Sequence, residues 1–244
     1  MLLPTGKKLG LPVMLAVVVF GVNSANADRR GYVWTYEYQT MPRGHAELEY
    51  YLTHKLPDSH KYSQKNTWEH QVELEYGLTD KLDVAVYQGW QQTNTSAEDR
   101  FEYTGSKARV RYRLGEKASN FLDTLLYFEY IRPDGSDGAE IFEGKLILAK
   151  DIGKFNLAYN QILKAGLNGR GGNENEFAFG FSREFSPVLK LGLESTGNYT
   201  EDKYYIGPTL SVASRKFWVS LGALRGLNDR SDDFRFRLIA GFPF

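Results

Sequence analysis

The 244-residue chain has no cysteine and no excess of either charge, with 30 basic and 30 acidic side chains. Without cysteine it cannot form a disulfide framework, so its fold must depend on a core or on backbone pairing. A neutral balance also offers no basic face, which argues against a nucleic-acid partner.

Long apolar runs are missing as well. No segment reaches the roughly 20 apolar residues of a membrane-spanning helix. The one continuous run, residues 9–22, is too short for an anchor; it follows two lysines and precedes Ala25 and Ala27. This layout is that of a secretory signal peptide. We predict that residues 1–27 are cleaved on export, which removes two lysines, leaves 28 basic and 30 acidic groups, and gives a net charge of −2.

Helical periodicity is almost absent from the remaining chain. Segments of about ten residues alternate apolar and polar side chains, and clusters of Gly, Asn, Asp and Ser separate them. This alternation is typical of half-buried β-strands. The pattern predicts one domain, residues 44–244, with strands at 44–54, 66–78, 81–91, 101–114, 121–132, 139–150, 154–164, 174–185, 188–199, 203–213, 216–226 and 232–244.

The connections between these segments alternate in length. Tight turns are expected at 77–81, 115–120, 151–154, 185–188 and 213–216. Longer, polar loops are expected at 55–65, 92–100, 133–138, 165–173, 200–203 and 226–233. Short turns at one rim, longer loops at the other and an even strand count are typical of outer-membrane barrels.

One face of most predicted strands carries the large apolar residues. Phe177, Phe179 and Phe181, for example, alternate with small residues. A soluble barrel would have to fill a wide interior with such side chains, whereas outward-facing ones require lipid. In hydrocarbon an open sheet edge leaves hydrogen bonds unmet, so the sheet must close. We therefore predict an all-β fold, a single antiparallel up-and-down transmembrane β-barrel of about 12 strands, with both ends of the exported chain on the periplasmic side.

Two local features qualify this pattern. Residues 28–43, "DRRGYVWTYEYQTMPR", could form a thirteenth strand, but an even count favours a periplasmic or lumenal lead-in. Pro208 lies in the middle of a predicted strand, where it removes a hydrogen-bond donor and predicts a bulge.

The last strand ends on Phe244, which resembles the C-terminal signature of bacterial outer-membrane proteins. This resemblance implies a Gram-negative outer membrane and recognition by the barrel-insertion machinery. The segments "EYGLTDKLDVAVY" (75–87), "GSKARVRYRLGEK" (105–117) and "EFSPVLKLGLE" (184–194) resemble the transporter-type barrels grouped with the MetA-pathway phenol-degradation proteins. That resemblance implies a role in the uptake of hydrophobic substrates.

The polar strand faces predict a charged lumen. The first three strands supply an acidic arc of Glu47, Glu49, Glu69, Glu73, Glu75 and Asp83. The fourth and twelfth supply basic ladders of Lys107, Arg109, Arg111, Arg113, Arg235 and Arg237. Because closure places the twelfth strand beside the first, basic ladders flank the arc on both sides. Such opposed charges either select polar solutes by their field or pair across strands and hold the interior together.

Catalytic patterns are missing from the chain. The four histidines show no His-x-Ser pattern, and a serine hydrolase needs such a base beside its nucleophile. The acidic turns at 133–138 and 228–233 lack calcium-loop spacing. We expect no enzyme activity, metal or cofactor. The sequence favours a porin-like channel for passive uptake of small solutes; the alternatives are a non-conducting structural or adhesive barrel with a salt-bridged lumen and, third, a lipid-active enzyme.

Overall fold

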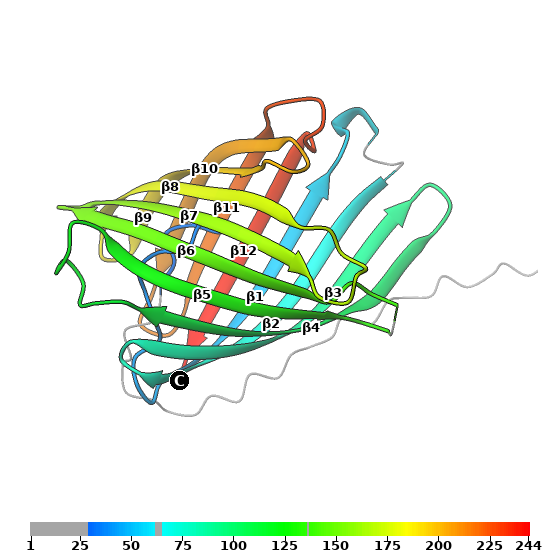
Figure 1. The fold of residues 1–244 in the computed structure, drawn as a ribbon. Coiled ribbons are helices and arrows are strands. Elements are labelled where there is room, and N and C mark those ends of the chain that lie inside the picture. The colour runs from blue at the N-terminus through cyan, green and yellow to red at the C-terminus, as the bar shows by residue number, and fades with distance from the viewer. Residues whose placement is uncertain (1–28, 62–64, 136) are drawn as a thin grey trace, which may run out of the picture.

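The computed structural model describes residues 29–61, 65–135 and 137–244. The predicted signal peptide lies outside these residues. Twelve antiparallel strands form one closed sheet, in which each strand pairs with its neighbours in sequence and β12 pairs with β1 (Figure 1). The predicted all-β, up-and-down barrel of 12 strands is confirmed.

Most strands begin and end within a few residues of the predicted positions. They are β1 (Ala46–Leu56), β2 (Lys65–Thr79), β3 (Leu82–Thr95), β4 (Asp99–Arg113), β5 (Asp123–Pro133), β6 (Ile141–Ile152), β7 (Phe155–Gly166), β8 (Glu174–Ser186), β9 (Leu189–Asn198), β10 (Lys203–Ala213), β11 (Trp218–Gly226) and β12 (Phe234–Pro243). A short 3₁₀ helix, η1 (Ser59–Lys61), lies between β1 and β2. Within the described ranges no helix is long and apolar enough to cross a membrane.

The prediction of a loop at residues 92–100 is wrong. There β3 and β4 continue as a hairpin whose pairing extends to Asn94 opposite Asp99. Side chains on this extension bond to one another, as Gln92 Nε2 does to Asn94 Oδ1 at 2.9 Å, and Asn94 Nδ2 also bonds to Asn66 Oδ1 of β2 at 2.9 Å. A strand surrounded by water on both faces needs no apolar alternation, so its sequence resembles that of a polar loop.

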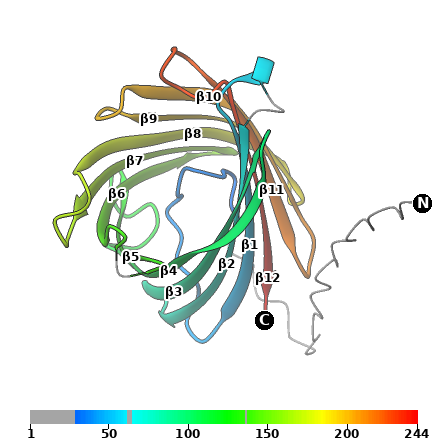
Figure 2. The ribbon, with the colours of Figure 1, turned by 90° about the vertical axis from the view of Figure 1, so that its right-hand side faces the viewer.

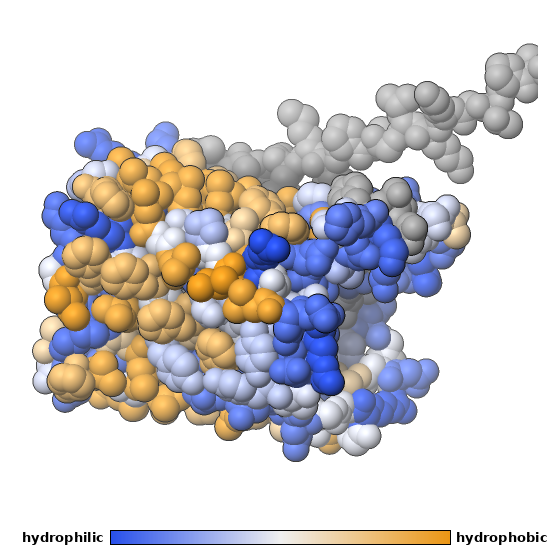
Figure 3. Space-filling view, turned by 90° about the horizontal axis from the view of Figure 1, so that it is seen from above, coloured by the Kyte–Doolittle hydropathy of each residue, from blue (hydrophilic) through white to orange (hydrophobic). Residues whose placement is uncertain are grey.

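Large apolar side chains cover the outside of the barrel. Val86 is 53% exposed and Leu193 46%, whereas Glu73 and Asp83 on the inner face are 0% exposed. In the space-filling view these apolar residues form a broad belt, and hydrophilic side chains gather at the right-hand end of the molecule (Figure 3). An apolar band outside a polar interior is the surface of a barrel embedded in lipid.

The barrel closes between the two ends of the sheet. β1 and β12 pair over ten residues, from Glu47 opposite Pro243 to Leu56 opposite Phe234. The seam continues into Phe244, whose N–H donates to the Ala46 carbonyl at 2.8 Å. The chain's last residue is therefore part of the closure, and its side chain lies 49% exposed on the apolar face.

Pro208 produces no bulge, contrary to the expectation from sequence. It pairs in register with Leu193 of β9, and the pairing of β10 with β11 is in the same register on both sides of it. Gly207 and Pro208 have no paired partner on β11, so the missing N–H of Pro208 interrupts no pair there. A Cβ on Gly207 would collide with the Ala223 carbonyl. The two backbones thus approach closely without an inserted residue.

Residues 29–44 do not join the sheet but enter the barrel (Figure 2). Most side chains from Arg29 to Met41 are buried. They pack in two clusters against the wall, one around Tyr32, Tyr36 and Tyr127 and one around Val33 and Trp218. We call residues 29–41 the lumenal segment; it makes up much of the barrel's core.

A charge placed on the apolar belt should destabilise the barrel. We expect Leu146→Arg, in the middle of β6, to lower the free energy of unfolding by about 2–4 kcal/mol, because the charge would face hydrocarbon. Denaturant titration of the barrel folded into lipid vesicles measures this change. Leu227→Arg, in the β11–β12 loop, is the matched control, and equal stability of the two variants would contradict the assignment of the belt to lipid.

Candidate functional site

The charged residues singled out in the sequence lie on the inner face of the wall, where they divide into two groups. Those nearer the tight turns are almost fully buried, whereas those nearer the longer loops line an open cavity. Seven buried residues form the turn-end group: Glu47, Glu49, Glu73, Glu75, Asp83, Arg109 and Arg111.

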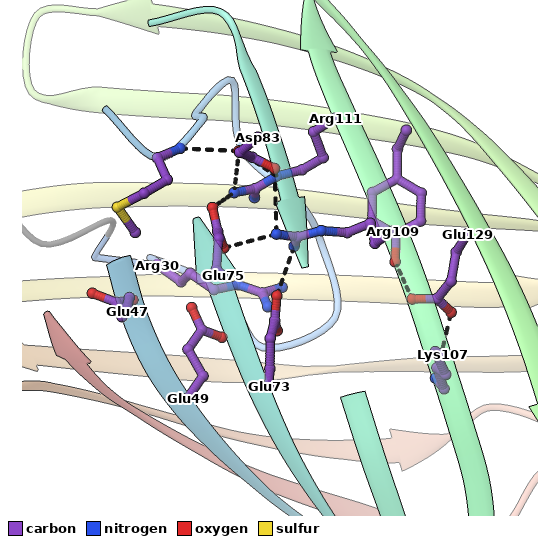
Figure 4. Close-up of polar contacts among 12 residues, drawn as sticks. Arg30, Glu47, Glu49, Glu73, Glu75, Asp83, Lys107, Arg109, Arg111 and Glu129 are labelled. Carbon is purple, nitrogen blue, oxygen red and sulfur yellow. Dashed lines mark hydrogen bonds and ion pairs between the residues drawn. The ribbon is translucent and has the colours of Figure 1, made fainter. Parts of the chain in front are cut away.

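Arg109 of β4 is the centre of the turn-end group (Figure 4). Its Nη1 lies 3.0 Å from Glu73, and its Nη2 lies 2.8 Å from Glu75 and 3.4 Å from Asp83. The Arg109 side chain is only 1% exposed. These strands are neighbours, so the sheet register brings the guanidinium directly between three carboxylates.

Arg111 lies one pleat further toward the turns and completes this network. Its Nε and Nη2 donate to the two Asp83 oxygens at 3.0 and 2.8 Å, and Nη2 also pairs with Glu75. Buried charges are tolerated when they are paired and hydrogen-bonded in this way. The network therefore ties β2, β3 and β4 together across the lumen face.

The remaining acids of β1 have polar neighbours of another kind. Trp218 Nε1 donates to Glu47 at 3.0 Å. The Tyr51 hydroxyl contacts the carboxylates of Glu49 and Glu73, the latter at 2.6 Å, and accepts a hydrogen bond from Arg30 Nη1 at 3.0 Å. Arg30 belongs to the lumenal segment, so this segment supplies a cation to the acidic arc.

At the loop end the charged residues form separate pairs. Lys55 Nζ lies 2.6 Å from Glu69, and Arg235 Nε lies 2.7 Å from Asp232. Lys107 lies 3.5 Å from Glu129. Arg113, at the other end of β4, donates to the Asp80 carbonyl and lies over the Tyr38 ring.

Glu194 of β9 holds the lumenal segment through its backbone. Its carboxylate accepts hydrogen bonds from the N–H groups of three consecutive residues, Val33 at 2.9 Å, Trp34 at 2.9 Å and Thr35 at 2.6 Å. Glu194 is 0% exposed. A charge-assisted acceptor for three buried donors is a strong anchor, because each donor would otherwise be left unsatisfied.

Other wall side chains satisfy the next part of the segment's backbone. The Asn160 amide accepts from the Tyr36 N–H at 2.6 Å and donates to the Tyr36 carbonyl at 3.0 Å, as a paired strand would. Asp83 accepts from the Met41 N–H at 2.9 Å, and Ser220 donates to the Arg30 carbonyl at 2.6 Å. Side chains, rather than the sheet's backbone, therefore hold this irregular segment.

Two glycines of the wall make room for the segment. A Cβ on Gly180 would lie 2.6 Å from the Tyr32 ring, and one on Gly222 would collide with the Val33 side chain. These glycines allow the segment to lie directly against the wall.

The lumenal segment separates two cavities. The first, of about 560 Å³, opens at the loop end and is lined by Lys55, Glu69, Lys107, Lys164 and Arg237 among others. The second, of about 170 Å³, is lined by residues of the tight turns, including Lys117, Asp151 and Lys154. We call them the loop-end vestibule and the turn-end vestibule. Residues of the lumenal segment line both.

Glu194 and Gly222 alternate with apolar residues in their strands, which is consistent with the inner face, but nothing in the sequence assigns them a role. Asn160 was missed entirely as an anchor. Their partner is an irregular segment more than a hundred residues away, and no local pattern encodes that pairing. The one available signal was the concentration of aromatic residues in 28–43, which suits a buried segment better than a solvated lead-in.

Comparisons with known proteins place the fold but no family. No family model matches the chain, and no curated protein matches it. Among solved structures, the KdgM porin in complex with disordered oligogalacturonate has a TM-score of 0.57 and 9% identity, covering 81% of this chain and 99% of that one. The Acinetobacter baumannii outer membrane protein Omp33 has a TM-score of 0.45 and 10% identity, covering 82% and 97%. The likeness to KdgM shows a shared barrel fold.

Removing the central guanidinium should destabilise the barrel. We expect Arg109→Ala to lower the free energy of unfolding by about 3–5 kcal/mol, because three buried carboxylates lose their shared cation. Denaturant titration in vesicles measures the loss. Arg100→Ala removes an exposed partner of Glu102 and should change stability by less than about 1 kcal/mol. Similar values for the two variants would show that the buried network is not needed for stability.

Proposed function

We propose that this chain is an outer-membrane, porin-like channel for small polar solutes, and that the lumenal segment closes it in the conformation described here. The observation that carries this proposal is the pair of vestibules, which lie at opposite ends of one obstruction. A purely structural barrel with a filled lumen would not require a cavity at each end.

Three observations support the outer-membrane location. The barrel carries an apolar belt, Phe244 bonds to Ala46 in the closing seam, and residues 9–22 have the layout of a signal peptide. In such barrels the short turns face the periplasm. On this orientation the loop-end vestibule opens to the outside, and lipid and the insertion machinery are the expected partners. KdgM, whose fold this chain shares, is a porin.

The way the lumenal segment is held supports a movable closure. Its bonds come from side chains such as Glu194 and Asn160, so it can leave without breaking any ladder of the sheet. The paired network of Arg109 joins β2, β3 and β4, whereas residues 33–36 of the segment bond to β7 and β9. Two further bonds tie the segment to the charged side of the lumen, from the Met41 N–H to Asp83 and from Arg30 to Tyr51. Displacement of the segment would break these bonds but leave the ion pairs between the wall strands in place.

The second candidate function is the non-conducting barrel with a salt-bridged lumen. The buried network of Arg109 and Arg111 favours it, because paired charges stabilise a filled interior. It differs from the first proposal in one respect: its interior should stay closed when the segment is removed.

An enzymatic role finds little support in the placement of the histidines. His54 stacks on Trp68 with ring centroids 4.1 Å apart, and His70 Nδ1 lies 2.7 Å from the Tyr50 hydroxyl. His45 lies at the tight-turn end of β1, and His60 lies in η1. These positions disperse the candidate bases, and we propose that the chain is not a lipid-active enzyme.

Deletion of residues 29–41 tests the channel directly. In planar bilayers we expect the intact barrel to show low or intermittent conductance and the deletion variant to show a higher, steady conductance, because the obstruction is gone. Circular dichroism and heat-dependent migration on gels establish that the variant is folded. A folded deletion variant without conductance would overturn the channel and favour the salt-bridged alternative.

A reversible lock tests the closure without removing core residues. The chain has no cysteine, so the pair Val33→Cys and Gly222→Cys offers a single possible disulfide between segment and wall. We expect the oxidised protein to be silent and reduction to restore openings. Each single cysteine variant is the control, and openings that persist in the oxidised protein would show that the segment is not the gate.

A further inference from the structure

Arg237 of β12 lies at the floor of the loop-end vestibule without a carboxylate partner. Its Nε donates to Thr53 Oγ1 at 2.8 Å and its Nη1 to the Val33 carbonyl at 3.1 Å. Its guanidinium lies 5.0 Å from the Trp34 ring centroid. Among the residues described, no acidic side chain comes within ion-pair distance of it. These contacts fix the guanidinium and leave donor N–H groups for another molecule.

The surroundings of Arg237 carry an excess of positive charge. Glu69 lines the same cavity, and Lys55 already binds that carboxylate at 2.6 Å. Arg30 lines the cavity as well and donates to the Tyr51 hydroxyl. Lys107, paired with Glu129, completes the floor. Arg30 faces Glu49 and Glu73 through the Tyr51 hydroxyl, so the floor itself holds three cations, Lys55, Lys107 and Arg237, against two carboxylates, Glu69 and Glu129.

The whole vestibule shows the same imbalance. Nine basic and six acidic side chains line it among the described residues. Most of the cations have an acidic neighbour; Lys203, for example, lies 2.7 Å from Glu201. Its volume of about 560 Å³ lies within the range of pockets that accept small molecules, about 300–1,000 Å³.

We infer that this floor binds the carboxylate of a small organic acid, with Arg237 as the residue that contacts it. A guanidinium offers a planar fork of donors that matches a carboxylate. Trp34, Tyr51 and Tyr87 line the same cavity and offer apolar contact to a ring on the solute. The inference names the solute class of the proposed channel and depends on that proposal only for the passage of the solute.

Three probes of one size test the charge preference. Benzoate, benzyl alcohol and benzylamine share a ring and differ in charge, and calorimetric titration of the folded barrel in detergent measures their affinity without any conductance. We expect benzoate to bind more tightly than the other two. Arg237→Gln should weaken benzoate about tenfold or more, since a charge-assisted bidentate contact is lost, and leave benzyl alcohol unchanged.

A matched variant separates this site from a general effect of charge. Lys203→Gln removes one positive charge from the same vestibule, but from a lysine already paired with Glu201, and should leave benzoate affinity nearly unchanged. Arg237→Lys keeps the charge without the fork and should give an intermediate affinity.

The Arg237→Gln variant could lose benzoate affinity for two reasons, because Arg237 also bonds to the Val33 carbonyl. The substitution removes the direct contact with benzoate, and it also removes a bond that holds the lumenal segment. The titrations are therefore repeated in the oxidised Val33→Cys and Gly222→Cys background, where the segment cannot move. Equal loss in the Arg237→Gln and Lys203→Gln variants, or benzylamine binding as tightly as benzoate, would overturn the site. Either result would leave the conductance test of the channel unaffected.

Discussion

The pairing of β1 with β12 is the interaction on which the rest of the structure depends. It leaves each of the twelve strands paired on both sides, so the wall presents only side chains to its surroundings. Apolar side chains can then face lipid because the backbone behind them is satisfied. The same closure encloses the charged side chains in a narrow space, where each must find a partner or remain in contact with water.

The lumen meets this requirement in two ways. Toward the turns, Arg109 and Arg111 each bind carboxylates at close range, and the water is replaced by the lumenal segment. Toward the loops, the space is left open and the charges pair one by one. The boundary lies at Tyr51 and Arg237, which contact the segment on one side and line the vestibule on the other. The acidic arc and basic ladders expected from the sequence therefore do not form one continuous lining: they are a buried network toward the turns and separate pairs toward the loops.

Much of the fold could be predicted because a strand's alternation is local. The alternation of apolar and polar residues with a period of two predicts which side chains face outward, such as Phe179 and Phe181, and which face inward, such as Asp83. The hairpin beyond residue 92 could not be predicted in this way, since water on both faces removes the alternation. Nor could the anchoring of Val33 by Glu194, because that pairing depends on closure and on residues 161 positions apart. Local patterns specify the wall, whereas the contents of the lumen depend on contacts that exist only once the wall is complete.

The two kinds of interior contact, the Arg109 network and the Glu194 anchor, also differ in what their loss would affect. The Arg109 network joins strands that the sheet already holds together, so its loss strains the wall itself. The Glu194 anchor joins the wall to a segment with no backbone pairing of its own to the sheet, so its loss frees only that segment. Three buried N–H groups released from Glu194 would be left without an acceptor in a dry lumen, which disfavours partial release. In the proposed opening, water entering from the two vestibules would supply those acceptors, so the segment would pass from one fully hydrogen-bonded state to another rather than loosen gradually.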